Sequence, residues 1–144
     1  MATLTATIPP AVVRTPADEQ SDLAADLAAL AEGSAVPNVH NVQSRPAILR
    51  RLAARLADGV APGTDRLVGE LAYAPLVTAV SLHTGVPFAL VDVDNHHVLG
   101  ELHPSERVVV ITYAGGHLGV QNVINECGAT VTYTGHALDE VGGQ

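Results

Sequence analysis

Residues 107–134 read RVVVITYAGGHLGVQNVINECGATVTYT, and this stretch decides the fold. It opens on a continuous apolar run from Val108 to Ile111, which is typical of a strand buried on both faces of a sheet. After a loop with two glycines, residues 118–127 keep apolar side chains at helical spacing and end before Gly128. A second β-rich run follows at residues 130–134. Strand, helix and strand in this order predict a βαβ unit with parallel strands.

The same alternation extends upstream of this unit. Residues 66–69 and 88–92 are further β-rich runs, and residues 75–83 between them have a helical pattern. Residues 92–103, with the sequence DVDNHHVLGELH, are polar and predict a loop. From residue 64 onward the sequence therefore predicts an α/β fold with four parallel strands.

The N-terminal part predicts two helices. The first runs from a cap at Ser21 to Gly33, and a loop over residues 34–46 separates it from the second, which ends at Gly59. We expect residues 1–18 to form a flexible arm and residues 19–144 to form a single domain. Three arginines of the second helix lie off its apolar stripe, which predicts a solvated face for Arg50, Arg51 and Arg55.

Composition excludes several classes of protein. The chain has 15 acidic residues against seven basic ones, giving a net charge of −8, and all seven basic residues are arginines. A nucleic-acid surface needs clustered positive charge, and the one cluster here is short, so we expect no nucleic-acid partner. Its members are Arg45, Arg50, Arg51 and Arg55. A single cysteine, Cys127, excludes an intramolecular disulfide and a cysteine-based metal site, which fits a reducing cytoplasm.

The sequence also lacks the usual signals for export or membrane insertion. The first 20 residues have neither the basic start nor the continuous apolar stretch of a signal peptide. No window approaches the ~20 apolar residues that a membrane-spanning helix needs. We therefore expect a cytoplasmic protein with no membrane partner.

Residues 64–134 carry an ordered set of short motifs. These are G-x-P-F at Gly85–Phe88, E-L-x-P-x-E-R at Glu101–Arg107, V-V-V-I at Val108–Ile111 and G-A-T-V at Gly128–Val131. Their order resembles the type I phosphoribosyltransferases, and orotate phosphoribosyltransferase most closely. The resemblance covers about half of the chain and implies an α/β fold with a parallel-sheet phosphoribosyltransferase-like core after N-terminal helices. It also implies a homodimer, because that family usually pairs.

The residues that hold phosphoribosyl pyrophosphate in that family are missing from this sequence. The family's strand ends in two adjacent acids that hold the ribose hydroxyls, whereas Val108–Ile111 is followed by Thr112 and Tyr113. If Ile111 and Thr112 are matched to the family's I-T instead, Val108 and Val109 take the place of the acids, so the pair is absent in either register. The pyrophosphate loop would fall at residues 70–74, where Glu70 would face the anion. Two like charges about 4 Å apart repel by about 4 kcal/mol at an effective dielectric near 20. The family's catalytic lysine would come from residues 92–103, which contain histidines and acids but no lysine. The resemblance therefore implies a degenerate active site without ordinary phosphoribosyl transfer.

Tyr113 and His117 are the first candidate catalytic residues. They follow the strand at residues 107–112, and open α/β sheets bind ligands at the carboxyl ends of their strands. A histidine at a helix N-terminus favours the neutral imidazole, which suits a general base. Tyr113 would donate a hydrogen bond to a developing oxyanion. The alternative is a tyrosine with a satisfied hydroxyl beside a surface histidine.

Glu101 is the third catalytic candidate, provided by a segment that would fold over a substrate as a lid. Two other interpretations of residues 92–103 stay open, a solvated loop and a metal site. The spacing of the histidines matches no standard zinc motif, so we expect neither metal nor cofactor. Residues expected to contact the substrate are Glu70, Tyr73, Gly115, Gly116, His96 and His97.

These features favour a repurposed enzyme of the phosphoribosyltransferase fold. It would act by acid–base chemistry on a small, mostly apolar metabolite, as a cyclase, lyase, isomerase or hydrolase, and we expect a place for it in bacterial secondary metabolism. Two alternatives stay open. One is an orotate phosphoribosyltransferase-like nucleotide enzyme that uses phosphoribosyl pyrophosphate, and the other is a non-catalytic sensing or partner-binding module.

Overall fold

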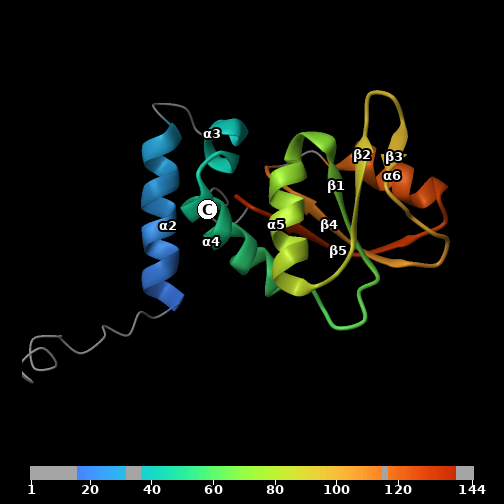
Figure 1. Cartoon of the computed structure of the whole chain (residues 1–144), viewed down its shortest axis with the longest axis horizontal. Helices are drawn as coiled ribbons and strands as arrows, with labels where there is room; N and C mark the ends of the chain where they lie inside the picture. Colours follow the sequence, from blue (N-terminus) through green and yellow to red (C-terminus); the bar gives the residue numbers. More distant parts are fainter. Residues whose placement is uncertain (1–15, 32–36, 115–116, 139–144) are drawn as a thin grey trace, which may run out of the picture.

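A five-stranded sheet forms the centre of the structure, a computed structural model that describes residues 16–31, 37–114 and 117–138 (Figure 1). Its strands are β1 (Arg66–Glu70), β2 (Phe88–Asp92), β3 (His97–Leu99), β4 (Arg107–Thr112) and β5 (Thr130–His136). They lie in the order β3-β2-β1-β4-β5. All neighbours are parallel except β2 and β3. The predicted α/β fold with four parallel strands is confirmed, and β3 is an addition.

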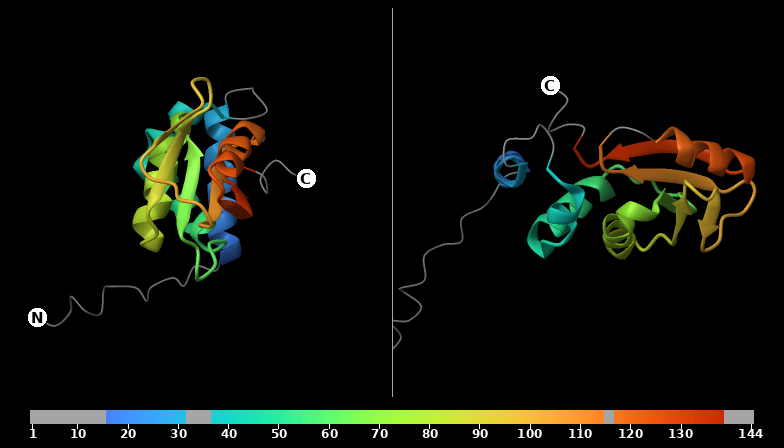
Figure 2. Two further views of the ribbon diagram at one scale, coloured as in Figure 1. Left: turned by 90° about the vertical axis from the view of Figure 1, so that its right-hand side faces the viewer. Right: turned by 90° about the horizontal axis from the view of Figure 1, so that it is seen from above.

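Helices cover both faces of this sheet. They are α2 (Pro16–Ala31), α3 (Val39–Gln43), α4 (Pro46–Ala57), the 3-10 turn η1 (Leu71–Tyr73), α5 (Ala74–Thr84) and α6 (Leu118–Glu126). Figure 2 shows α5 and α6 on opposite sides of β1. The helices α2, α3 and α4 pack on one another, with α2 farthest from the sheet (Figure 1). No helix among the described residues is long and apolar enough to span a membrane.

The position of β4 between helices on both faces of the sheet explains why its sequence is apolar without interruption. Val108 and Val110 pack into a cluster with the apolar side chains of α6, whereas Val109 and Ile111 pack with those of α4 and α5. Successive side chains of a strand point to opposite faces, so a strand covered on both sides needs an apolar residue at every position. All four side chains are at most 1% exposed.

Gly69 in β1 allows α5 to approach the sheet closely. A Cβ atom at this position would lie 2.5 Å from Cγ2 of Val77 and 2.8 Å from the carbonyl oxygen of Ile111. The valine belongs to α5 and the carbonyl to β4. The absence of a side chain at Gly69 therefore sets the distance between the helix and the end of β1.

The N-terminal part differs from the sequence prediction in two places. Helix α2 begins at Pro16 rather than at Ser21, so the last three residues of the predicted arm belong to this helix, and the rest of the arm lies outside the described residues. The predicted loop over residues 34–46 contains helix α3, whose cap Asn38 accepts a hydrogen bond from the backbone N–H of His40. A helix of five residues is too short to show a hydrophobic period, so the pattern missed it.

The predicted solvated face of α4 is correct for one of its three arginines. Arg50 is exposed, but Arg51 pairs with Asp26 of α2. Arg55 is partly buried and donates a hydrogen bond to the backbone carbonyl of Ala137. Because α4 lies between α2 and the end of the sheet, these two arginines join α4 to its neighbours instead of facing water only.

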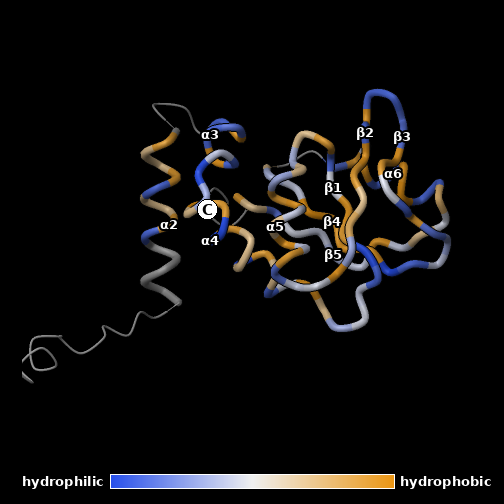
Figure 3. Tube along the Cα trace, viewed as in Figure 1, coloured by the Kyte–Doolittle hydropathy of each residue, from blue (hydrophilic) through white to orange (hydrophobic). Residues whose placement is uncertain are grey.

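Residues 92–103 form a hairpin rather than a single loop. Strand β3 pairs with β2, and the turn between them is held by the Asp92 carboxylate, which accepts hydrogen bonds from the side chain and backbone N–H of Asn95. The bond from the Asn95 side chain is the main cause that lowers the pKa of Asp92. The turn is hydrophilic (Figure 3). The sequence pattern did not predict β3 because the strand has only three residues and the segment around it is polar.

Candidate functional site

The carboxyl ends of β1, β4 and β5 meet at one edge of the sheet, and each ends in a residue with a polar side chain. Thr112 pairs in register with His136, and β1 pairs with β4 as far as Val68 and Val110. Continuing this register by two residues brings Glu70 next to Thr112. Glu70, Thr112 and His136 therefore form a row across three strands. Alternation places Glu70 on the same face as Val68, which packs beneath α6. We call this row the carboxyl-edge row.

His117 contacts this row from the start of α6. Its ring packs edge-on against His136, with ring centroids 5.4 Å apart and an interplanar angle of 76°. The Nδ1 atom of His117 is buried and has no hydrogen-bond partner among the described residues. A proton on Nδ1 would therefore lack an acceptor there, which favours the tautomer with the proton on Nε2.

Glu70 lies where its charged form is disfavoured. Burial is the main cause that raises the pKa of Glu70, and the negative charge of Asp94 raises it further. Asp94 belongs to the turn after β2, and its neighbour Val93 packs against Gly119 of α6, where a Cβ atom would lie 2.7 Å from Val93 Cγ1. Glu70 and the first turn of α6 thus face the same β2–β3 turn.

Two exposed leucines stand beside these polar groups. Leu71 follows Glu70 directly and is 44% exposed, and Leu118 follows His117 directly and is 70% exposed. Single exposed leucines are ordinary on a protein surface. Their position next to Glu70 and His117 gives this edge an apolar border.

Tyr113 lies on the opposite face from His117. Its hydroxyl donates a hydrogen bond of 2.7 Å to the carbonyl oxygen of Pro37, and the residue is only 5% exposed. Burial raises the pKa of Tyr113 to about 12. Its ring packs with Tyr73 at a centroid distance of 6.1 Å. This geometry matches the alternative of a satisfied tyrosine hydroxyl, because Tyr113 joins the segment before α3 to the sheet.

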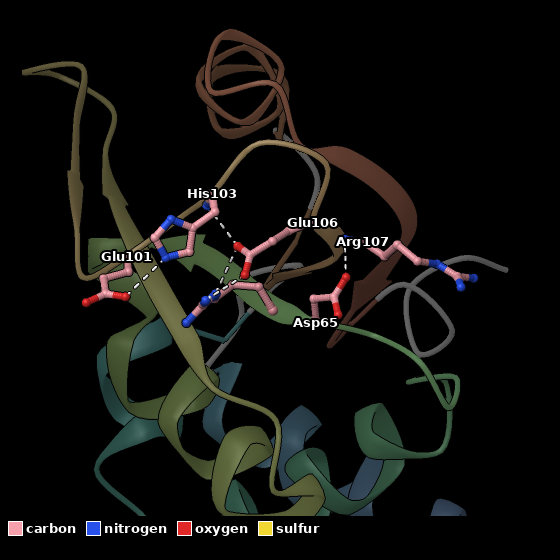
Figure 4. Close-up of polar contacts among 6 residues, drawn as sticks. Asp65, Glu101, His103, Glu106 and Arg107 are labelled. Atoms are coloured by element: carbon pink, nitrogen blue, oxygen red, sulfur yellow. Dashed lines mark hydrogen bonds and ion pairs between the residues drawn. The ribbon is translucent and has the colours of Figure 1, made fainter.

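Glu101 lies beside His103 and Glu106 (Figure 4). This is the other end of the sheet from Tyr113 and His117, the two residues that the sequence prediction grouped with it. Strand β3 runs antiparallel to β2 and returns the chain to the amino ends of the parallel strands. There Glu101 Oε1 lies 3.1 Å from His103 Nε2, beside an ion pair between Arg66 and Glu106 with a shortest distance of 2.7 Å. The structure therefore places Glu101 away from the carboxyl edge, where the sequence prediction put it as part of a lid.

The remaining predicted residues are dispersed. His96 Nε2 lies 2.6 Å from Glu126 Oε1, His97 is exposed at the start of β3, and Tyr73 borders Glu70, whose charge helps burial to raise the pKa of Tyr73. Gly115 and Gly116 lie outside the described residues. Within residues 16–31, 37–114 and 117–138, no group of three or more His, Cys, Asp or Glu side chains is placed to hold a metal.

Sequence reasoning missed His136. The predicted strand ended at Thr134, whereas β5 extends two residues further, to His136. The signal was weak because Gly135 interrupts the β-rich run just before the histidine. In the structure Gly135 leaves space for Leu56 of α4, since a Cβ atom there would lie 3.1 Å from Leu56 Cδ2.

Similarity to known proteins is visible in structure and not in sequence. No protein-family model and no curated protein sequence matches the chain. UMP synthase from Leishmania donovani superposes on 70% of the chain with a TM-score of 0.61 and 20% identity. Adenine phosphoribosyltransferase from Leishmania tarentolae superposes on 67% with a TM-score of 0.55 and 18% identity. The same enzyme from Leishmania donovani superposes on 69% with a TM-score of 0.56 and 16% identity.

The matched region is only part of each of these proteins. The chain covers 24% of the UMP synthase and 60% and 56% of the two adenine phosphoribosyltransferases. At these identities the likeness concerns the fold. It confirms the predicted resemblance and the predicted fold class.

Proposed function

We propose that this chain, which has the type I phosphoribosyltransferase fold, is an acid–base enzyme that acts on a small, mostly apolar carbonyl compound. The observation that carries the proposal is that Glu70, a carboxyl group of raised pKa, lies at the same edge and on the same face as His117 at the start of α6. Its substrate would bind over the carboxyl-edge row, between Leu71 and Leu118. The reaction class is an isomerisation, elimination or cyclisation that begins with loss of a C–H proton.

Glu70 is assigned the role of general base. Its carboxylate takes the proton from the carbon next to the carbonyl group, and the electron pair of that C–H bond moves to the carbonyl oxygen. A carboxylate whose pKa is raised by burial is a stronger base than one in water, which favours this transfer. In an isomerisation Glu70 returns the proton to a neighbouring carbon. In an elimination the electron pair of the enolate expels the group on the next carbon, which takes the proton, and in a cyclisation the enolate carbon bonds to a second carbonyl carbon, whose oxygen takes the proton. Glu70 is regenerated as the carboxylate in each case.

His117 is assigned the role of neutral hydrogen-bond donor rather than that of the base. The buried Nδ1 without a described partner favours a proton on Nε2. An Nε2–H group directed at the carbonyl oxygen would stabilise the negative charge that develops there. His136 packs against the ring and would keep its orientation.

Phosphoribosyl transfer receives less support. Val108 and Val109, which replace the two ribose-binding acids in the resemblance, are at most 1% exposed within β4. Glu70 and Asp94 place negative charge at the edge where a pyrophosphate would bind. Repulsion between like charges disfavours such a ligand.

Deuterium exchange in D₂O tests the proposal directly. The protein is incubated with a panel of small apolar ketones and β-keto esters, and loss of the α-proton signal is followed by NMR. Glu70→Gln should slow exchange by about 10²- to 10⁴-fold, and His117→Ala by about 10²-fold. Glu101→Gln is the matched control, because it removes an equivalent carboxylate at the opposite end of the sheet and should leave the rate unchanged.

Three outcomes would contradict these roles. One is an equal loss of exchange in Glu70→Gln and Glu101→Gln. Another is a protein that binds members of the panel, seen as shifts of its own NMR signals, and exchanges none of them. The third is micromolar, Mg²⁺-dependent binding of phosphoribosyl pyrophosphate in calorimetry, which would favour the nucleotide alternative.

A further inference from the structure

We infer that Gln43 is a positioning residue for the proposed site, because its side-chain amide holds the turn that directly follows Glu70. The inference rests on the proposed function for the role of Glu70, and its experiment can be read without that function. Gln43 is the last residue of α3, a helix outside the sheet. A helix of the N-terminal part would therefore control the geometry of a group at the carboxyl edge.

Two hydrogen bonds join Gln43 to the segment after Glu70. Its Nε2 donates to the backbone carbonyl of Ala72 at 3.1 Å, and its Oε1 accepts from the backbone N–H of Leu76, also at 3.1 Å. Ala72 belongs to η1, and Leu76 belongs to the first turn of α5. A single side chain therefore ties the turn to the helix that begins directly after it.

Helix α5 begins without a cap from its own sequence, which explains why a distant side chain provides one. Its N-cap residue, Tyr73, makes no side-chain capping bond, and Pro75 has no N–H group to donate. The N–H of Leu76 is at the third position of the helix, where a capping side chain usually accepts. Gln43 Oε1 takes this place, so removal of Gln43 should loosen both the first turn of α5 and η1.

A second contact holds the α3 segment, residues 37–43, against the same turn. The hydroxyl of Tyr113 donates to the carbonyl oxygen of Pro37 at 2.7 Å, and its ring packs with that of Tyr73 in η1. Val42 of this segment is 1% exposed and belongs to the core. The segment is thus fixed at both of its ends, which makes it a rigid support for η1.

The backbone has to position Glu70, because no hydrogen bond from the described residues holds its carboxylate. Before it, β1 pairs with β2 so that Glu70 lies beside Val91. After it, the chain enters η1 at Leu71, where Gln43 fixes the turn. A misplacement of about 1 Å at a reacting group lowers a rate by about 10²-fold. Gln43 therefore provides on one side of Glu70 what strand pairing provides on the other.

An NMR titration of the Glu70 carboxyl group tests this role without any substrate. Gln43→Met removes both hydrogen bonds and keeps a side chain of similar length. The loosened turn should admit water to Glu70, so the pKa of this group, which burial raises, should fall toward the ordinary value of glutamate. The matched control is Asn38→Ala, which removes the hydrogen bond to the His40 N–H at the other end of α3. It should leave the pKa of Glu70 unchanged.

Two further measurements separate positioning from general stability. The Leu76 N–H should exchange slowly with D₂O in the wild-type chain and about tenfold faster in Gln43→Met. In the α-proton exchange assay, Gln43→Met should lower kcat by about 10- to 100-fold and change KM by less than about twofold. Asn38→Ala should change neither constant. Circular dichroism should show that both variants are folded.

Three results would overturn the inference. One is a Leu76 N–H that is unprotected in the wild-type chain, a result that needs no variant. Another is a Glu70 pKa that is equal in Gln43→Met and wild type. The third is an equal shift in Gln43→Met and Asn38→Ala, which would reflect a loss of stability alone. Failure of the proposed function has a different signature, because the wild-type chain would exchange no α-protons while the Glu70 pKa still responded to Gln43→Met.

Discussion

The two ends of the sheet shift the pKa of their carboxyl groups in opposite directions. At the amino end, Glu106 pairs with Arg66, and the hydrogen bond from that guanidinium is the main cause that lowers the pKa of Glu106. At the carboxyl end, burial and the charge of Asp94 raise the pKa of Glu70. A charge held by a partner stabilises the fold, whereas a group whose charge is disfavoured is available for proton transfer. This difference agrees with a structural role for the Glu106–Arg66 pair and with the role proposed above for Glu70.

The difference follows from what each strand end contacts. Arg66, the first residue of β1, is paired with Val108, and its side chain reaches Glu106 just before β4. The two side chains are only 13% and 15% exposed. Glu106 also accepts a hydrogen bond of 2.9 Å from the backbone N–H of His103. Glu70 has Asp94 and Tyr73 near it. The negative charge of Asp94 raises the pKa of Glu70, and the negative charge of Glu70 in turn raises the pKa of Tyr73.

Substitution of Gly69 should give the largest effect on stability, because it disturbs the close packing of α5 and β4 against the end of β1. In Gly69→Ala the new methyl group would overlap Val77 and the backbone carbonyl of Ile111, and a backbone atom within a sheet has little freedom to move. We expect the free energy of unfolding to fall by about 3 kcal/mol, the upper part of the range for overpacked cores. Urea denaturation followed by circular dichroism measures this change.

Gly85→Ala is the control for the loss of glycine itself. Gly85 has a φ of 78°, and a Cβ atom there would have no other atom within 4 Å, so only the backbone conformation opposes alanine. Its cost should be about 1 kcal/mol. Equal losses in the two variants would show that close packing at Gly69 does not position the end of β1.

Removal of the charge of Glu106 should give the next largest effect. Glu106→Gln leaves the mostly buried Arg66 without its ionic partner, and the free energy of unfolding should fall by about 2 kcal/mol at neutral pH. Because the pKa of Glu106 is lowered in the folded state, its contribution is present above the pKa of the unfolded chain and is lost as the pH falls through the folded value. The stability difference between wild type and variant should therefore disappear in acid.

Glu101→Gln provides the contrast within the same end of the sheet. The Glu101 carboxylate is 75% exposed and contacts an exposed histidine, so its removal should change stability by less than about 0.5 kcal/mol. If Glu101→Gln cost as much as Glu106→Gln, the amino end would be stabilised by the whole cluster and not by the buried pair.

The sequence was sufficient to predict the fold but only part of the site. Continuous apolar runs such as Val108–Ile111 mark buried strands whatever the rest of the chain does. Such runs do not show on which face of the sheet a residue after the strand lies. Tyr113 and His117 are close in sequence, yet they lie on opposite faces because the strand alternates and α6 covers only one side. Glu101 was misplaced because a three-residue strand reversed the chain.

The candidate site also depended on a pairing that no local pattern contains. His136 meets His117 because β5 lies beside β4 in a specific register, with Thr112 opposite His136. Register is set by the packing of whole strands, so a single sequence does not give it. Glu70, by contrast, was expected at this edge, because the resemblance placed it in the loop that follows the first parallel strand.

The smallest expected effect has the opposite sign from the others. Because the pKa of Glu70 is raised, the stability associated with its protonated form is present below the pKa of the unfolded chain and is lost as the pH rises through the folded value. Glu70→Gln should therefore increase the free energy of unfolding at neutral pH and match wild type in acid. Solvent screens this partly buried group, so the gain should be on the order of 0.5 kcal/mol.

Asp94→Asn sharpens this last prediction. Removal of the Asp94 charge should lessen the raised pKa of Glu70, so the gain from Glu70→Gln should be smaller in the Asp94→Asn background than in wild type. Urea denaturation of the four proteins at neutral and acidic pH measures both differences. If Glu70→Gln destabilised the protein at neutral pH, the Glu70 carboxylate would have a favourable ionic partner. The two ends of the sheet would then hold their charges alike, and the assignment of Glu70 as a base would lose its physical reason.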